Sequence, residues 1–287
     1  MLRRRFIAAA TLTAATTPVA RLTSAAPAAA AALTDVNLWT DAWVVRHPPT
    51  RDLDGLLARI RRHGVTSGWA GSFEGVLHTD VAGANARLTE TCARTGGLLL
   101  PFGTVNPTFP DWEEDLRRCH EECRMRGIRV FPNYHGFDLA DARFARLLTA
   151  AAARRLIVQI VVAIEDERSQ NPALSAAPVA LAPLPDLMRR TPGARVMLLN
   201  AASRVISASN PLARRLVEAG VGFDLATLET VAGVETALRN VPGLRFSFGS
   251  HAPYFYFEAA LLKLRESELS PEQDAAIRHG HAAGLLA

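Results

Sequence analysis

Short apolar runs alternate with helical patterns along most of this 287-residue chain. The candidate strands lie at 33–38, 65–70, 98–105, 128–131, 156–164, 196–199, 221–223 and 244–248. Within these runs the apolar residues are continuous rather than alternating with polar ones, which is typical of parallel strands covered on both faces. The pattern therefore predicts a parallel sheet of eight strands.

Two of the other segments carry clear helix signals. In the first, apolar residues recur at helical spacing and a glycine ends the pattern: Leu53, Leu56, Leu57, Ile60 and Gly64. In the second, near the end of the chain, Ser270 is the expected N-cap, with Pro271 at the first helical position and Gln273 at the third. The last helix is therefore predicted to begin at a capping box.

Eight strands with helices between them match the (β/α)8 barrel, which takes about 250 residues. We expect one barrel domain over 33–287. An open doubly wound sheet is the alternative, but no Gly-rich phosphate loop of the G-x-G-x-x-G or Walker type follows a predicted strand. In a barrel, the residues after each strand gather at one mouth, which is where function is expected.

Residues 1–32 have the composition of a targeting segment. "RRRFI" at 3–7 precedes a weakly apolar Ala/Thr run and an Ala-rich stretch that ends at Ala32. The RRxF pattern resembles a twin-arginine export signal, and the apolar run is too short to span a bilayer. We expect a periplasmic or extracellular protein without a membrane span in its mature part. An Ala-rich leader with chance arginines is the alternative.

The charge distribution argues against a nucleic-acid partner. The net charge is +4, and four arginines precede any acidic residue: Arg3, Arg4, Arg5 and Arg21. Without them, 28 basic residues face 28 acidic ones, so no basic footprint for nucleic acid remains. The three cysteines, Cys92, Cys119 and Cys123, are an odd number and are expected to pack in the core.

Polar and aromatic side chains stand at the ends of the predicted strands. Candidate substrate-binding residues are Asn37, Trp39, Glu74, Tyr134, His135, Gln159 and Asn200, and candidate catalytic residues are Glu165, Arg168, Asp224 and His251. Structural alternatives stay open for several of them. His135 could bond its own loop backbone, the charged run 165–168 could be a solvated loop, and Trp39 and Tyr134 could pack in the core.

Three motifs resemble the amidohydrolase superfamily, in its branch of small amidohydrolase-related lactonases and nonoxidative decarboxylases. "RGIRVFPNYHGFDL" at 126–139 is similar to this branch's glycine-led strand and its turn, and "FGSHAPY" is similar to its "FGSDAP" ending. The final "AIRHGHAAGLL" is similar to its terminal helix, with His281 in place of an asparagine. The resemblance covers nearly all of the chain after the leader, and it implies a (β/α)8 barrel and a small-molecule substrate.

The metal-binding pattern of that family is not kept. The resemblance implies His-x-His on the first strand, a histidine on each of strands five and six, and an aspartate on strand eight. The matching positions hold Asn37 with Trp39, Gln159, Asn200 and His251. Amide side chains are poor zinc ligands and an indole offers none, so we expect no tight metal site at the inherited positions.

Three functions are compatible with these residues. The first is a metal-free hydrolase of a small cyclic ester, amide or carboxylated substrate, in which His251 is the general base, Asp224 orients it, Glu165 or Asp166 is a second carboxylate and Arg168 stabilises an oxyanion. The second is a zinc-dependent hydrolase or decarboxylase with a relocated site built from His135, His251, Glu165 and Asp224. The third is a noncatalytic binding protein that kept the barrel. A homo-oligomer is compatible with each.

Overall fold

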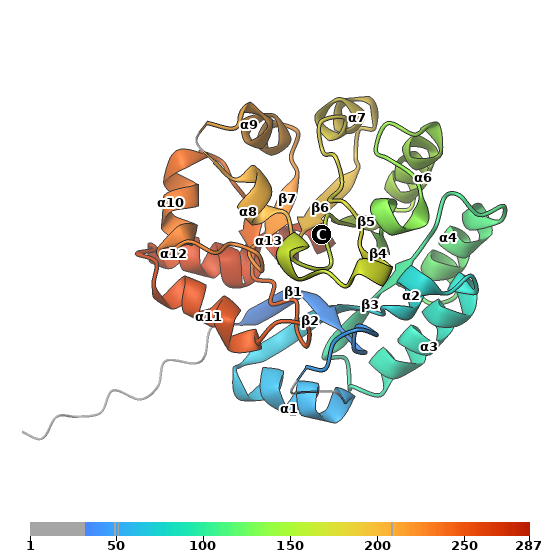
Figure 1. Cartoon of the computed structure of the whole chain (residues 1–287), viewed down its shortest axis with the longest axis horizontal. Coiled ribbons are helices and arrows are strands. Elements are labelled where there is room, and N and C mark those ends of the chain that lie inside the picture. Colours follow the sequence, from blue (N-terminus) through green and yellow to red (C-terminus); the bar gives the residue numbers. More distant parts are fainter. Residues whose placement is uncertain (1–31, 49, 51, 208) are drawn as a thin grey trace, which may run out of the picture. The chain divides into compact units, whose positions relative to one another are not determined.

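A computed structural model describes residues 32–287 except 49, 51 and 208. Its eight strands are parallel and are paired in sequence order, as Figure 1 shows. They are β1 (Leu33–Trp39), β2 (Val65–Gly71), β3 (Leu99–Thr104), β4 (Gly127–Val130), β5 (Ile157–Val161), β6 (Arg195–Leu199), β7 (Gly222–Asp224) and β8 (Phe246–Ser247). All eight lie within or close to the predicted runs.

The sheet closes where β1 meets the segment that follows β8. The backbone N–H of Val36 donates to the carbonyl of Phe248, and the N–H of Trp39 donates to the carbonyl of Ala252, both at 2.9 Å. A sheet whose first and last strands pair is a barrel. The predicted (β/α)8 barrel is therefore confirmed.

Helices surround the barrel in a ring. They are α1 (Leu53–Arg62), α2 (Glu74–Leu77), α3 (Val81–Ala93), α4 (Trp112–Glu121), α5 (Pro132–His135), α6 (Ala142–Ala153), α7 (Leu184–Arg190), α8 (Ala202–Val205), α9 (Pro211–Glu218), α10 (Gly233–Asn240), α11 (Phe257–Arg265), α12 (Pro271–Ala275) and α13 (His281–Leu286). Short 3-10 turns cover Glu167–Ser169 and Pro172–Leu174 in the loop after β5.

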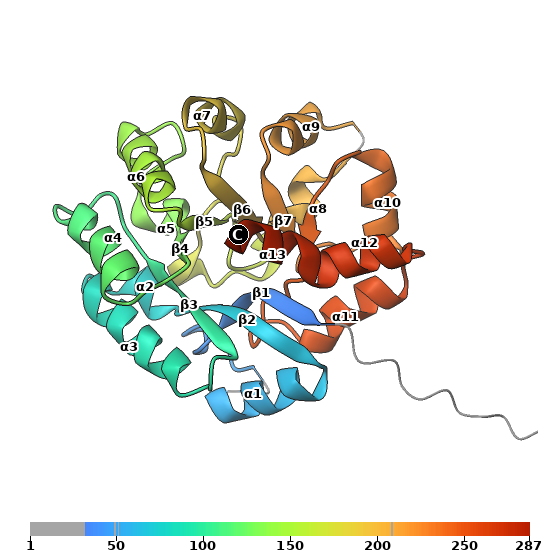
Figure 2. The same cartoon turned by 180° about the vertical axis from the view of Figure 1, so that it is seen from behind.

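Both helices with clear sequence signals are present. Asp52 caps α1, and its side chain accepts from the N–H of Gly55. Ser270 and Gln273 form the capping box at the start of α12, which continues through a π-helical turn (Ala276–Gly280) into α13. Figure 2 shows these last helices running across the face of the barrel at the amino ends of the strands.

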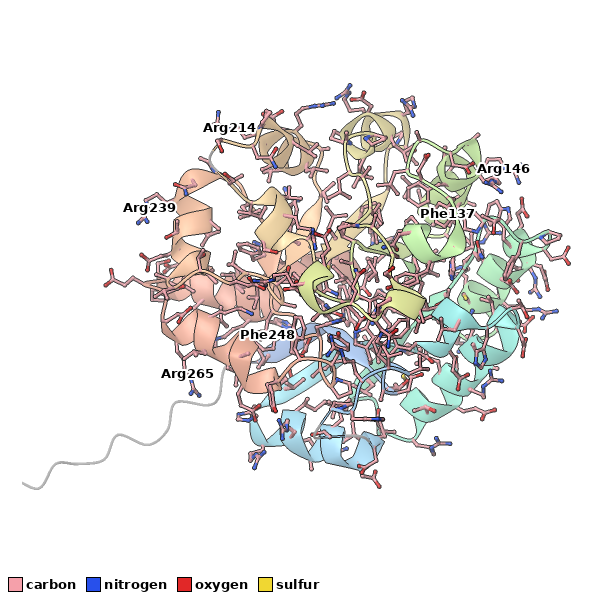
Figure 3. The ribbon with its side chains drawn as sticks, viewed as in Figure 1. Phe137, Arg146, Arg214, Arg239, Phe248 and Arg265 are labelled. Carbon is pink, nitrogen blue, oxygen red and sulfur yellow. The ribbon has the colours of Figure 1, made fainter. Side chains whose placement is uncertain are left out.

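Two apolar clusters stabilise the barrel. The larger one joins the helices to the outside of the sheet, and the smaller one fills the interior with Trp39, Trp69, Phe73, Phe102 and neighbouring side chains. In Figure 3, arginines such as Arg146 and Arg239 point away from the ring of helices. Full burial of both sheet faces explains why the strands read as continuous apolar runs.

The export segment, membrane spans and the cysteines remain to be compared with the structure. The predicted export segment, residues 1–32, lies outside the described residues apart from Ala32. Among the helices of the described part, none is long and apolar enough to cross a membrane. Cys92 and Cys119 are buried free thiols, and Cys123 is a partly buried one.

Candidate functional site

The barrel mouth is formed by side chains from five strand ends. Asn37 and Trp39 come from β1, Gln159 from β5, Asn200 follows β6, Asp224 ends β7, and His251 follows β8. All six are at most 2 % exposed. They are therefore part of a packed interior, and their chemistry depends on their protein neighbours rather than on solvent.

His251 is held by a hydrogen bond on each ring nitrogen. The indole Nε1–H of Trp39 donates to Nδ1 at 2.9 Å. An indole N–H can only donate, so Nδ1 is the acceptor and the proton is on Nε2, which donates to the carbonyl of Ile164 at 3.0 Å. Burial lowers the pKa of His251 to about 3, so the ring is neutral at physiological pH.

Asn37, Asn200 and Asp224 form a second network beside that histidine. The Asn37 side-chain N–H groups donate to Asn200 Oδ1 at 2.9 Å and to Asp224 Oδ2 at 2.6 Å. The backbone N–H of Asn200 donates to Asp224 Oδ1 at 2.9 Å, and its side chain donates to the carbonyl of Ala163. Both oxygens of Asp224 are thus occupied by partners other than His251.

Burial shifts the pKa values of the carboxyl groups in this region upward. The pKa of Asp224 rises to about 7, chiefly because it is fully buried, although the hydrogen bond from Asn37 acts in the opposite direction. The pKa of Asp35 rises to about 6 for the same reason, despite hydrogen bonds from the backbone of Asn37 and Ser250. Carboxyl groups with pKa values near neutrality are typical of functional sites, but structural networks also produce them.

Arg129 is a buried cation that sequence reasoning did not select. Its guanidinium donates to Gln159 Oε1 at 2.7 Å and to the carbonyls of Leu38, Trp69 and Val36. It also lies 4.6 Å from the centre of the Trp39 ring. The sequence feature that could have identified Arg129 is its place as the lone charged residue inside the apolar run 128–131. Gln159 is occupied as well, since its amide N–H donates to the carbonyl of Val36.

Aromatic rings close the mouth above this network. Trp39 stacks on Phe73 with ring centres 3.9 Å apart and planes within 3°, and Trp43 packs on both Phe73 and Tyr134. Trp39 and Trp43 are at most 1 % exposed. Trp39 thus lies beside the site as predicted, but it packs against other rings and does not line an open pocket.

Glu165 belongs to a separate latch, which we define as Arg46, Glu165 and Tyr254. Arg46 Nε and the Tyr254 hydroxyl donate to Glu165 Oε1 at 3.1 and 3.0 Å. The latch joins the loops after β1, β5 and β8. Arg46 and Tyr254 were not selected from the sequence, where no spacing relates them to Glu165.

The remaining candidates lie apart from this centre. Arg168 has a side chain 76 % exposed and pairs with Asp166 and Glu229, while Glu74 pairs with Arg87. His135 Nε2 lies 3.1 Å from the carbonyl of Gly75, and burial lowers its pKa to about 4. Within the described part of the chain, His251 makes no hydrogen bond to Asp224, Glu165 or Arg168, although the hydrolase hypothesis needs Asp224 to orient it.

The residues at the mouth do not fit a divalent metal ion. Trp39 presents an N–H, and the amide nitrogens of Asn37 and Asn200 already donate to protein acceptors. Within the described part of the chain, no group of three or more His, Cys, Asp or Glu side chains could hold a metal. His135, His251, Glu165 and Asp224 thus do not converge on a relocated zinc site.

A small cavity remains beside the network. It holds about 40 Å³ and is lined by Ala163, Ile164, Glu165, Asp166, Asn200, Ser203, Arg204, Thr227, Glu229 and Phe255. Ligand sites usually measure ~300–1,000 Å³, so this cavity has room for little more than a water molecule.

Comparison with known proteins points to a single family. The family model described as "Amidohydrolase" matches residues 24–286, whereas no curated protein matches. The fold is similar to 5-carboxyvanillate decarboxylase from Sphingomonas paucimobilis, with 15 % identity, a TM-score of 0.68 and coverage of 89 % of this chain and 99 % of that one.

Two further solved structures have the same fold. For 2,6-dihydroxybenzoate decarboxylase from Rhizobium the identity is 13 %, the TM-score 0.66 and the coverage 89 % of this chain and 98 % of the other. A dihydroxybenzoic acid decarboxylase from a Polaromonas species is described with bound manganese and 2-nitroresorcinol. Its identity to this chain is 13 %, the TM-score is 0.64, and the match covers 89 % of this chain and 96 % of the other.

Proposed function

Because the chain belongs to the amidohydrolase family, we propose that it is a noncatalytic member, in which a hydrogen-bonded core replaces the family's metal centre. The observation that carries this proposal is the bond from Trp39 Nε1 to His251 Nδ1 at 2.9 Å. A general base needs a free lone pair within reach of a substrate proton. In His251 the lone pair on Nδ1 accepts the hydrogen bond from Trp39, and Nε2 carries a proton that it donates to the carbonyl of Ile164.

The packing of the mouth supports the same function. Trp39 and His251 are both 0 % exposed, and Phe73 covers the outer face of the indole. A substrate could reach His251 only if these rings moved and two buried hydrogen bonds were broken. Leaving buried donors and acceptors unpaired costs ~1–3 kcal/mol for each group, which opposes such an opening.

The enzymatic alternative is hydrolysis or decarboxylation of a small carboxylated substrate at a rearranged mouth. One observation favours it: Asp224 is a buried carboxyl whose pKa is raised to about 7, which is suited to proton transfer near neutral pH. Structures of the same fold are described as decarboxylases. This alternative requires the contacts of His251 and Asp224 to rearrange.

The test combines metal content, turnover and the protonation of His251. We expect protein from cells grown with zinc and manganese to contain no stoichiometric metal. We also expect it to turn over no lactone, ester or hydroxybenzoate. Nitrogen NMR should show an Nε2-protonated neutral His251 between pH 5 and 8. Turnover that is lost in both His251→Gln and Asp224→Asn but kept in the matched surface variant Glu229→Gln would replace this proposal with the enzymatic one.

A further inference from the structure

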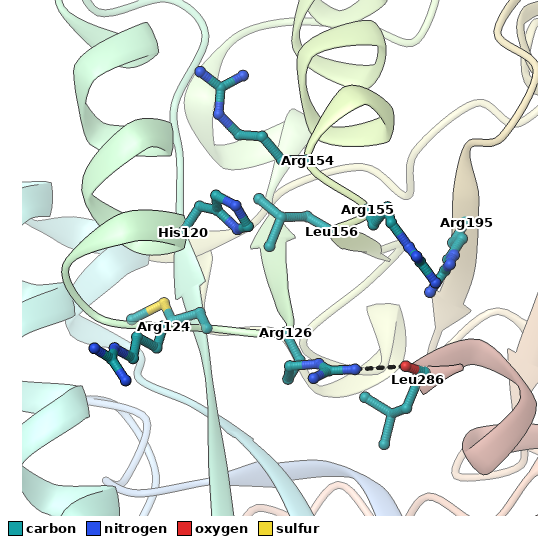
Figure 4. A pocket seen from close by; sticks show the side chains of 9 residues that line it. His120, Arg124, Arg126, Arg154, Arg155, Leu156, Arg195 and Leu286 are labelled. Atoms are coloured by element: carbon teal, nitrogen blue, oxygen red, sulfur yellow. Dashed lines mark hydrogen bonds between the residues drawn. The ribbon is translucent and has the colours of Figure 1, made fainter.

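A second cavity lies at the opposite end of the barrel from the mouth. It holds about 420 Å³ and is lined by His120, Arg124, Met125, Arg126, Arg154, Arg155, Leu156, Arg195 and Leu286. These residues come from the turn after α4, the turn after α6, the start of β6 and the end of α13. In Figure 4, Arg126, Arg155 and Arg195 lie on the side of Leu286, whereas the side chains of Arg124 and Arg154 extend away from it.

The charge in this cavity is of one sign. Five guanidinium groups line it and no carboxylate side chain does. Within the described part of the chain none of the five pairs with an Asp or Glu side chain, although Arg155 bonds a main-chain oxygen of Ala287, and the residues outside that part include neither acid. The acids closest in sequence, Glu121 and Glu122, bond Arg117 at 2.9 and 2.6 Å instead.

Two of these arginines occupy backbone positions that favour glycine. The turns from helix to strand all contain a residue with positive φ, and in five of them it is a glycine: Gly64, Gly96 with Gly97, Gly193, Gly220 and Gly243. In the two remaining turns it is Arg124, with φ 52°, and Arg155, with φ 56°. Left-handed backbone is costly for a residue with a Cβ, and both exceptions line the same cavity.

A structural role explains only some of the arginines. Arg126, Arg155 and Arg195 donate to main-chain oxygens of Leu286, Ala287 and Leu285, so they hold the end of the last helix. Each uses one of its five N–H donors there. The side chain of Arg124 makes no hydrogen bond in the described part of the chain, and the side chain of Arg154, the C-cap of α6, donates only to the carbonyl of Ala150. Neither holds the last helix.

We propose that this arginine cavity binds a small organic anion with two or more phosphate or carboxylate groups. The planar guanidinium fork matches the oxygens of both groups in bidentate pairs. A volume of about 420 Å³ lies within the usual range for small-molecule sites. The buried side chains of Met125 and Leu156 supply an apolar floor. This inference does not depend on the proposed loss of catalysis at the mouth.

Pyrophosphate and citrate are suitable probes, titrated into the full chain by calorimetry and thermal unfolding at constant ionic strength. We expect at least one of them to raise Tm by roughly 3 °C at ten times its Kd. Arg154→Gln and Arg124→Gly should each weaken binding by about tenfold or more. Arg124→Gly should at the same time keep or raise Tm without ligand, because glycine adopts left-handed backbone without strain.

Arg214→Gln is the matched control, since it removes the same charge from an exposed position on α9; Figure 3 labels it. It should bind the probes as the wild type does. Absence of binding of both probes to the wild type would overturn the proposal. So would equal affinities in Arg124→Gly, Arg154→Gln and the wild type.

Discussion

His251 and Asp224 are both fully buried, yet burial moves their pKa values in opposite directions. It lowers the pKa of the imidazole to about 3 and raises that of the carboxyl to about 7, because in each case the uncharged form is favoured in a poorly solvated place. The contribution of His251 to the free energy of unfolding is therefore fully present above its ordinary pKa of 6.5, and it is lost as pH falls toward 3. Asp224 favours folding below pH 4, and its contribution is lost as pH rises through 7.

The first prediction follows from the direction in which Asp224 changes stability with pH: its contribution is lost as pH rises. In Asp224→Asn the side chain no longer titrates, so the variant avoids the loss that the wild type suffers as pH rises. The Tm of the variant minus that of the wild type should therefore increase between pH 5 and 8. Asp35 and His251 titrate in both proteins, so their own titrations contribute to both Tm values, and the charge of Asp35 in addition raises the pKa of Asp224. A difference that is flat or decreasing over this range, measured by thermal unfolding, would show that Asp224 is ionised throughout.

At the scale of elements, β2 and β4 approach each other through Gly71 and Arg129. A Cβ at residue 71 would lie 2.7 Å from Arg129 Nη1 and 2.8 Å from its Cδ. The guanidinium is fixed by bonds to several strands, so it cannot move aside without leaving partners unpaired.

We therefore expect Gly71→Ala to lower the free energy of unfolding by ~1–3 kcal/mol, the usual cost of overpacking. Gly284→Ala in α13 is the control, because nothing lies within 4 Å of a Cβ built there, and alanine is the better helix former. Urea unfolding of both variants gives the comparison. Equal stability of the two variants would mean that Arg129 adapts to the added methyl group.

At the scale of the whole molecule, the latch of Arg46, Glu165 and Tyr254 joins three loops over the mouth. The Glu165 side chain is 0 % exposed, whereas that of Arg46 is 39 % exposed. A charge-assisted bond with one buried partner contributes more than a surface ion pair. The latch is thus one of the polar contacts that keep the loops after β1, β5 and β8 together, beside the bond from His251 to the carbonyl of Ile164.

Glu165→Gln should loosen those loops without unfolding the barrel. We expect a loss of roughly 1–2 kcal/mol and faster hydrogen exchange confined to residues 40–48 and 165–175. Glu229→Gln, which removes an exposed carboxylate 3.4 Å from Arg168, should leave exchange in these loops unchanged. Unaltered exchange in Glu165→Gln would show that the other contacts of these loops hold the mouth closed without the Glu165 carboxylate.

The order of apolar runs was enough to predict the barrel, because strands covered on both faces must be apolar throughout. The apolar spacing from Leu53 and the capping signal at Ser270 likewise placed two helices. The placement of Asn37, Trp39, Asn200 and His251 near strand ends followed from the same order and from family resemblance. These features depend on residues close together in the sequence, or on the regular geometry of a barrel.

Only the tertiary structure decided which side chains meet. Trp39 and His251 are 212 residues apart, and Arg46 and Glu165 are 119 apart, so no spacing could pair them. The arginine cavity is a clearer case: the sequence shows no basic cluster after the leader, yet neighbouring turns place five guanidinium groups around one cavity. By itself, the sequence determined the barrel and showed amide and indole side chains at the positions where the family resemblance implies metal ligands. Long-range packing decided that His251 is a hydrogen-bonded core residue, because burial and its partners, not its position at a strand end, set its protonation.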